Sequence, residues 1–139
     1  MLKVTTAQDC GFAINPLAVE GQIEGSVGFA VGQALSETLM MDNGQVMNAN
    51  FIDYRIPIAS DIRDIDSIIV ESNDPNGPYG AKEAAEAVHP ATIAAIANAI
   101  ANATGVRPKA LPITPEKMLN LLKEKEAREE QAAASTPRA

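Results

Sequence analysis

The sequence predicts an α+β fold with one long helix, a β-hairpin with a small sheet, and two or three further helices. Three observations lead to this prediction. From Asn15 to about Glu37, four glycines are spaced four, three and four residues apart, which aligns them in one stripe along a helix. An Asn-Gly pair at 43–44 separates two short runs, which is the strongest local signal of a hairpin. Residues 91–104 repeat apolar side chains at helical spacing.

The long helix has a marked start. Asn15 is a favourable N-cap, and Pro16 suits the first helical position. Both sides of the helix are apolar, so we expect it to be buried. Each glycine destabilises a helix interior by roughly 1 kcal/mol relative to alanine, so something must offset the stripe. Spacing alone favours tight packing against another backbone, and the alternative is a flat ligand laid against the helix. The glycines are Gly21, Gly25, Gly28 and Gly32.

Three further segments are expected to be extended. Residues 2–7 read as a β-branched strand with no obvious partner in the sequence, which suggests a chain that begins partway into a larger fold. Residues 50–58 are expected at a sheet edge or as an extended segment, because Pro57 lacks the N–H that a central strand needs. Residues 66–72 predict a buried strand.

The second half of the chain predicts helices with defined ends. Residues 83–88 have helical composition, but His89-Pro90 should interrupt it, since a residue before proline is pushed out of the α region. The helix over 91–104 should end at Gly105, a residue type common just past helix ends. A last helix should open at Thr114, which is followed by proline and an acid.

The chain has 139 residues, enough for one modest domain, which we predict over residues 1–122. Residues 123–139 should form a charged helix end and a disordered tail, with disorder from Ala132. The single cysteine, Cys10, excludes an internal disulfide and a cysteine-only zinc site, and favours a cytoplasmic location. We see no apolar export signal or membrane span.

The charge pattern argues against nucleic acid and membrane as partners. The net charge is −7, and no basic residue lies between Lys3 and Arg55. A surface built from this region could not neutralise nucleic-acid phosphates or attach to anionic lipids. With one histidine far from the one cysteine, no residue is predicted to ligate a metal. Six acids fall between Lys3 and Arg55: Asp9, Glu20, Glu24, Glu37, Asp42 and Asp53.

The segment GPYGAKEAAE, residues 77–86, is the strongest candidate for chemistry. A glycine-rich loop runs into an expected helix start, and Glu83 and Glu86 are three residues apart, on one helix face. Acids in the first turn of a helix are often explained by the helix dipole alone, and the residues by themselves favour this explanation over a catalytic one. The alternative is a carboxylate that takes a proton at the mouth of a site. A Cys10–His89 nucleophile pair is conceivable, but a buried cysteine and a helix-breaking surface histidine are the plainer interpretation.

Four segments together resemble a known family. INPLAVEGQIEGSVGFAVGQALSE, NFIDYRIP, GPYGAKEAAE and AIANAIANATGVRPKALPITPEKML occur in the order and spacing of the C-terminal end of the molybdenum-binding subunit of the xanthine dehydrogenase/aldehyde oxidase family. The resemblance spans about residues 3–122. It implies a C-terminal fragment of a molybdopterin-binding domain, catalytic only when joined to the rest of the subunit.

The resemblance also implies which residues act. Gln22, beside Gly21, would contact the pterin, which favours the ligand interpretation for the start of the glycine helix. In the family's G-x-K-x-x-G-E loop the final glutamate is the base at molybdenum, and here this is Glu86. The same loop places three residues at the cofactor: Gly80, Ala81 and Lys82.

Two departures bear on the substrate. Ala85 stands where the family's usual glycine precedes the base, and Glu83 replaces a small residue, so the loop is closest to the hydroxybenzoyl-CoA reductase branch. The implied reaction is hydroxylation of an electron-poor carbon in a heterocycle, aldehyde or aryl substrate, or else reductive dehydroxylation of an aryl-CoA. Implied partners are the remainder of the molybdenum subunit, an iron–sulfur subunit and possibly an FAD subunit. The rival hypothesis is a non-catalytic remnant or scaffold that retains the fold.

Overall fold

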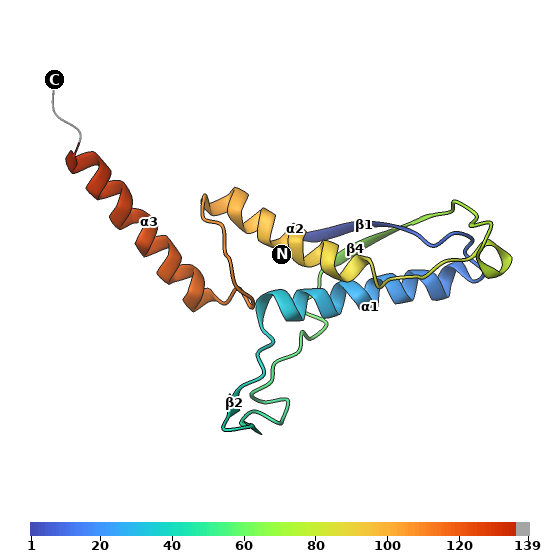
Figure 1. Cartoon of the computed structure of the whole chain (residues 1–139), viewed down its shortest axis with the longest axis horizontal. Helices are drawn as coiled ribbons and strands as arrows, with labels where there is room; N and C mark the ends of the chain where they lie inside the picture. Colours follow the sequence, from blue (N-terminus) through green and yellow to red (C-terminus); the bar gives the residue numbers. More distant parts are fainter. Residues whose placement is uncertain (136–139) are drawn as a thin grey trace.

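The structure is a computed structural model that describes residues 1–135, and it confirms the α+β prediction. A two-stranded sheet lies along a long helix, a second helix packs beside that helix, and a hairpin and a third helix extend away from this body (Figure 1). The elements in order are β1 (Lys3–Asp9), α1 (Pro16–Leu35), β2 (Met41–Asp42), β3 (Gln45–Val46), β4 (Asp64–Val70), a 3-10 turn η1 (Pro78–Gly80), α2 (Val88–Thr104) and α3 (Pro115–Ser135).

The sheet pairs the first strand with a distant one. β1 and β4 run parallel, with Val4 opposite Ile65 and Gln8 opposite Ile69. Alternate residues on one face are buried or half-buried against the helices, and the other face is exposed. β4 is therefore half-buried, where the sequence predicted a buried strand. No strand forms over residues 50–58, so of the two alternatives predicted there, a sheet edge or an extended segment, the sheet edge is wrong.

The core lies between the sheet and the two helices α1 and α2. Ile23, Val27 and Val31 on α1 pack with Ala85, in the segment before α2, and with Val88, the first residue of α2. α1 thus packs against β4 and α2 together (Figure 1). Half-buried apolar side chains surround this cluster: Val4, Val19, Leu35, Ile65, Ile69 and Ile96.

The glycine stripe of α1 has two different halves. A Cβ added at Gly32 would lie 2.7 Å from Pro57 Cδ, and one at Gly28 would lie 3.3 Å from Ile62 Cδ1. At Gly21 and Gly25 an added Cβ would meet nothing within 4 Å. The C-terminal half is therefore packed and the N-terminal half is bare. The expectation of a fully buried helix is wrong, because one side of α1 is open in its first half.

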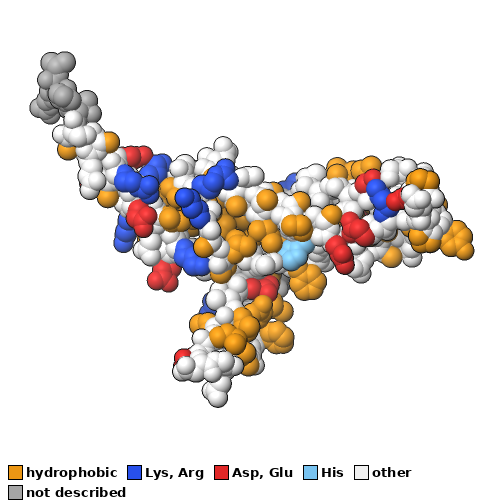
Figure 2. Space-filling view, viewed as in Figure 1, with side chains coloured by type: hydrophobic (Ala, Val, Ile, Leu, Met, Phe, Trp, Pro, Cys, Tyr) orange, Lys and Arg blue, Asp and Glu red, His pale blue; other side chains and the backbone are white. Residues whose placement is uncertain are grey.

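The start of α1 and the hairpin confirm the local signals. Asn15 Oδ1 accepts a hydrogen bond from the Ala18 backbone N–H at 3.2 Å, as an N-cap should. At the hairpin tip, Asn43 and Gly44 both have positive φ, as a type I′ turn requires. The arm that carries the hairpin exposes many apolar side chains (Figure 2). They are Leu39, Met40, Met41, Val46, Met47, Phe51, Ile52, Ile56 and Ile58.

The two C-terminal helices differ from their predictions at two ends, the start of α2 and the end of α3. Pro90 lies in the first turn of α2, where a missing N–H is tolerated, so the predicted interruption at His89-Pro90 is wrong. Gly105 ends α2 with φ of 69°, as predicted. α3 continues to Ser135, so the disorder predicted from Ala132 is wrong over residues 132–135, and the rest of that prediction lies outside the described residues. Within residues 1–135, no helix has the length and apolar composition needed to cross a membrane.

Candidate functional site

A cavity of about 450 Å³ lies between the bare half of α1 and the segment that enters α2. This volume is within the ordinary range for small-molecule sites. Three predicted site residues, Gly21, Gln22 and Glu86, line it together although they are distant in sequence. Its full lining is Gly21, Gln22, Gly25, Ser26, Phe29, Ala84, Ala85, Glu86 and His89.

A second, smaller cavity adjoins Gln22. It has a volume of about 230 Å³, and its lining includes Ala81, Lys82 and Gln22. Gln22 therefore faces both cavities, and it links the two groups of predicted residues. Gly80 lies in the η1 turn just before this segment. The predicted residues thus lie along one side of the molecule rather than in one hollow.

Glu86 has an exposed side chain whose carboxylate makes no hydrogen bond or ion pair within the described residues. Its backbone N–H donates to Glu83 Oε2 at 3.0 Å. The segment is not helical here, because Ala85 has φ of 92° and α2 begins only at Val88. The prediction that Glu83 and Glu86 share a helix face is therefore wrong, and the helix-dipole explanation for both acids no longer applies.

Glu83 has a structural position. Its Oε2 accepts the Glu86 N–H, and its Oε1 accepts a hydrogen bond from Gln8 Nε2 at 2.9 Å. Gln8 is a buried residue of β1, only 6% exposed. Glu83 therefore ties the loop to the sheet, while the neighbouring Glu86 keeps both carboxylate oxygens available to a ligand.

Lys82 is held by Asp9 at the end of β1. Lys82 Nζ lies 2.5 Å from Asp9 Oδ2, and the same carboxylate accepts hydrogen bonds from the Gly11 N–H and Ser72 Oγ. The Lys82 hydrogen bond, followed by that of Gly11, lowers the pKa of Asp9 to about 2. The same hydrogen bond and charge raise the pKa of Lys82.

The backbone N–H groups of the predicted cofactor loop are already engaged. Gly80 N–H donates to Gly77 O, Ala81 N–H to Pro78 O, and Lys82 N–H to Cys10 O. These donors shape the turn and attach it to the residue after β1. Ala81 and Lys82 of this loop line the second cavity, but the backbone N–H groups of the loop donate to carbonyl groups of the chain itself.

The sequence interpretation missed two residues that line the 450 Å³ cavity. His89, expected at the surface, is half-buried, and its Nε2 is buried with no hydrogen-bond partner among residues 1–135. Ser26 lies in the middle of α1 and bonds outside its own helix. A serine inside an apolar helix is a weak signal of such a bond. Cys10 is buried, as the plainer interpretation expected, and lines the other cavity.

Comparisons with known proteins show the family to which the chain belongs. Residues 1–63 match the family described as molybdopterin cofactor-binding domain. The putative xanthine dehydrogenase molybdenum-binding subunit XdhA of Escherichia coli K12 is 38% identical over 118 residues, which is 84% of this chain and 16% of that subunit. Quinoline 2-oxidoreductase from Pseudomonas putida 86 has a TM-score of 0.79 at 35% identity, over 86% of this chain and 16% of that one. Aldehyde oxidoreductase from Desulfovibrio gigas has a TM-score of 0.77 at 38% identity, over 86% of this chain and 13% of that enzyme.

The chain is a C-terminal-type part of the molybdopterin-binding domain of the xanthine dehydrogenase/aldehyde oxidoreductase family. The resemblance seen in the sequence is confirmed at this level. The molybdopterin-binding domain described here spans about one sixth or less of the length of the relatives it matches, 16% of the E. coli subunit and 13% of the D. gigas enzyme.

Ala85 of this molybdopterin-binding domain has a backbone conformation that favours glycine. Its φ of 92° is disfavoured for a residue with a side chain. Here the methyl group is packed in the core, with Ala85 only 5% exposed. The buried methyl contacts partly offset the strain of the backbone.

The residues of the larger cavity fit a bound molybdopterin. Gly21 and Gly25 leave the backbone of α1 uncovered, so that a flat group can approach it closely. Gln22 provides an amide that can both donate and accept, and His89 has a buried ring nitrogen without a partner in the described chain. Glu86 adds an unpaired carboxylate to the same wall. An uncovered surface beside unused polar groups is the lining that a polar, flat cofactor needs.

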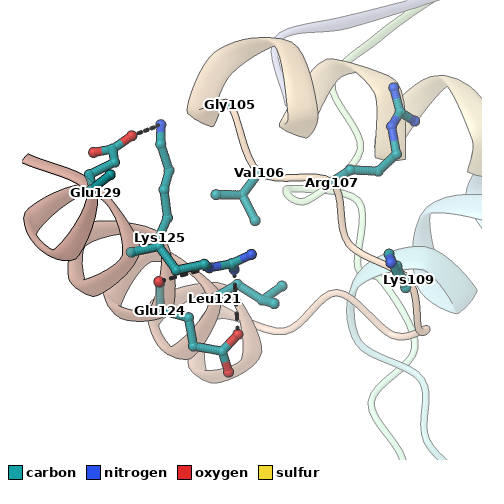
Figure 3. Close-up of a pocket in the computed structure, with 10 residues that line it drawn as sticks. Gly105, Val106, Arg107, Lys109, Leu121, Glu124, Lys125 and Glu129 are labelled. Carbon is teal, nitrogen blue, oxygen red and sulfur yellow. Dashed lines mark hydrogen bonds and ion pairs between the residues drawn. The ribbon is translucent and has the colours of Figure 1, made fainter. Parts of the chain in front are cut away.

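A third hollow, of about 660 Å³, lies between the C-terminal end of α2 and α3 (Figure 3). Lys125 caps α2 there, because its Nζ donates to Thr104 O at 3.1 Å, and it also lies 3.8 Å from Glu129. The lining is mostly exposed charged side chains, and none of the predicted site residues contributes to it. This hollow lies where α3 meets the end of α2, and its lining shares no residue with the candidate site.

Proposed function

We propose that this chain supplies the catalytic base and part of the cofactor wall of a molybdenum hydroxylase, active when joined to the rest of the molybdenum subunit. The observation that supports this most is the unpaired carboxylate of Glu86 on the wall of the 450 Å³ cavity, where Gly21, Gly25 and Gln22 also lie. A base must have access to its proton and must not be neutralised by an internal partner, and Glu86 meets both conditions.

The chemistry divides between the cofactor and this chain. Bound molybdopterin supplies the two-electron redox chemistry by which an electron-poor carbon is hydroxylated. Gly21 and Gly25 allow the cofactor to lie against α1, and the Gln22 side chain hydrogen-bonds its polar edge. Glu86 takes the proton that the reaction releases and passes it to solvent, to which its side chain is open.

Gly80, Ala81 and Lys82 are proposed to bind the cofactor by forming a complementary surface and not by donating hydrogen bonds to it. Their N–H groups are engaged within the chain, and the Lys82 ammonium group is paired with Asp9. Ala81 and Lys82 would form a wall of the second cavity beside Gln22, and Gly80 would shape the turn that precedes them. In this proposal Lys82 holds the loop to Asp9 and does not contact the reacting atoms.

For the substrate, we propose an electron-poor carbon of a heterocycle, an aldehyde or an aryl compound. The GAKEAAE loop, with Glu83 and Ala85, supports the hydroxybenzoyl-CoA reductase branch and the reductive direction as the alternative. The proposed partners are the remainder of the molybdenum subunit, an iron–sulfur chain and an FAD chain to carry the electrons. A chain with one cysteine and no disulfide suits the cytoplasm, the compartment we propose.

A non-catalytic remnant that keeps the fold is the second candidate. The observation in its favour is that, among the described residues, only α1 and residues 84–89 line this cavity, which is open to solvent. Neighbouring reading frames separate the two. Frames that encode the remaining molybdenum subunit and a ferredoxin-like protein agree with the enzyme, and their absence agrees with the remnant.

Glu86→Gln in the assembled enzyme tests the proposal. Glutamine keeps the size of the side chain but does not accept a proton near neutral pH. We expect unchanged molybdenum content and reduction by substrate slowed by roughly 10²–10⁴, the usual contribution of general base catalysis. Rapid mixing with substrate measures the rate, and metal analysis of the same sample measures the cofactor.

Glu24→Gln is the matched control. Glu24 is an exposed residue of α1 outside the cavity lining, so this change removes the same charge without touching the site. Glu83→Gln is unsuitable as a control, because Glu83 bonds both Gln8 and the Glu86 N–H. A Glu86→Gln enzyme with full molybdenum that is reduced as fast as the Glu24→Gln enzyme would refute the base assignment.

A further inference from the structure

Ser26 joins α1 to the loop that carries Glu86. Its Oγ donates a hydrogen bond to the Ala85 carbonyl at 2.7 Å, across fifty-nine positions of sequence. The bond is partly buried beside the core cluster, and Ser26 itself lines the 450 Å³ cavity. A helical serine that bonds to another segment fixes that segment relative to the helix axis.

The Ala85 carbonyl receives a second hydrogen bond, from the Val88 N–H at 3.1 Å. This N–H belongs to the first residue of α2. One carbonyl oxygen thus joins α1, through Ser26, to the start of α2. Because Glu86 is the next residue after Ala85, the direction of its side chain depends on how this peptide is held.

The backbone at Ala85 is strained, and strain persists only where the surroundings determine it. Its φ of 92° is disfavoured for any residue with a side chain. Four interactions hold this peptide: the packed Ala85 methyl group, the Ser26 and Val88 bonds to the Ala85 carbonyl, and the Glu83 bond to the Glu86 N–H. Among these hydrogen bonds, only the one from Ser26 is made by a residue of α1, so its loss removes the hydrogen bond between α1 and this peptide.

We infer that Ser26 is a positioning residue that aims the Glu86 carboxylate through the Ala85 carbonyl. The inference rests on the proposed role of Glu86 as the base. It assigns to Ser26 an effect on catalysis without contact with the reacting atoms. The hydroxyl group is the essential feature, so threonine should substitute for serine and alanine should not.

The experiment compares Ser26→Ala, Ser26→Thr, Glu86→Gln and the Ser26→Ala/Glu86→Gln double variant in the assembled enzyme. For Ser26→Ala we expect amide hydrogen exchange over residues 84–88 about tenfold faster, as loss of one hydrogen bond predicts. Reduction by substrate should slow roughly ten- to a hundredfold, as for a misplaced catalytic group, with molybdenum content and KM unchanged. Ser26→Thr should restore both exchange and rate.

The double variant separates positioning from general stability. If Ser26 acts through Glu86, the double variant should be no slower than Glu86→Gln alone, because the group it positions is already lost. A double variant slowed by the product of the two single effects would overturn the inference. So would Ser26→Ala with wild-type exchange and rate beside a slow Glu86→Gln.

The two proposals fail in different ways. A Glu86→Gln enzyme that is as fast as wild type refutes the base assignment, whatever Ser26 does. In that case, faster amide exchange in Ser26→Ala would show that the Ser26 bond only holds the loop in place. The inference that Ser26 positions a base would then be refuted as well. A slow Glu86→Gln and an unaffected Ser26→Ala would refute the positioning role only.

Discussion

The Asp9 carboxylate joins three segments of the chain at the end of β1. It accepts hydrogen bonds from Lys82 in the loop before α2, from Gly11 in the turn after β1, and from Ser72 in the segment after β4. These bonds need the ionised carboxylate. Its charge state therefore links acidity of the solution to the position of the loop that carries Glu86.

This arrangement predicts acid sensitivity. The pKa of Asp9 is lowered from 3.8 to about 2 in the folded chain, mainly by Lys82, so folding is stabilised above the unfolded value. The stabilisation should be lost as the pH falls from about 4 to about 2. We expect Asp9→Asn to be less stable than wild type at pH 6, with a smaller further loss of stability between pH 4 and pH 2. Urea midpoints measured across this pH range test it.

Asp42→Asn is the matched control, because it removes one aspartate from the exposed hairpin. Its stability should follow the wild-type pH dependence over the acid range. If wild type and Asp9→Asn lose stability in parallel between pH 4 and pH 2, the Asp9 interactions do not contribute to acid sensitivity.

At the scale of a single element, α1 provides an internal comparison between its two glycine halves. Gly25→Ala should stabilise the chain by up to about 1 kcal/mol, because alanine favours the helix and its methyl group meets nothing within 4 Å. Gly32→Ala should destabilise it by roughly 1–3 kcal/mol, because its methyl group would lie 2.7 Å from Pro57 Cδ. Urea unfolding of both variants measures the difference.

The same pair tests why the bare half exists. In the assembled enzyme, Gly25→Ala should lower the molybdenum content, because its methyl group enters the space against which the cofactor is proposed to lie. Raised stability and full molybdenum in the assembled Gly25→Ala enzyme would indicate that this half of the stripe faces neither a ligand nor a neighbour.

The ends of elements could be predicted because their signals are local. Asn15 and Gly105 act on the adjacent turns, and the Asn-Gly pair needs only its own two φ angles. The entry to α2 could not be predicted in this way. Propensity favours a helix for an alanine-rich run such as residues 83–88, but here Ser26, Gln8 and the core fix a non-helical path.

Some residues of the candidate site could be predicted from the sequence, but the difference between Glu83 and Glu86 could not. The resemblance pointed to Gln22 and Glu86, and the structure places both on one cavity. Sequence spacing made Glu83 and Glu86 equivalent, and only the partner on β1 distinguishes them. His89 was missed because its burial depends on α1, a segment sixty positions earlier whose contact with it leaves no periodic signal.

For the molecule as a whole, the open cavity predicts weak cofactor retention. The lining comes from α1 and residues 84–89 alone, and a side-chain hydrogen bond such as one from Gln22 contributes about 1 kcal/mol. The purified 139-residue chain should therefore hold no stoichiometric molybdenum and convert no substrate. Metal analysis of the chain by itself checks this, and one molybdenum per chain would show that the described residues suffice for binding.

The parallel pairing of β1 with β4 has a consequence for synthesis. Lys3 lies opposite Asp64, so the first strand must wait for a partner sixty-one positions further along the chain. At ribosomal speeds this interval is on the order of 3–12 s. α1 can form during it, because its bonds are local, but Ile23 and Val27 have no sheet to cover them. The nascent chain therefore exposes the apolar side of α1 for seconds before the sheet that covers it can form.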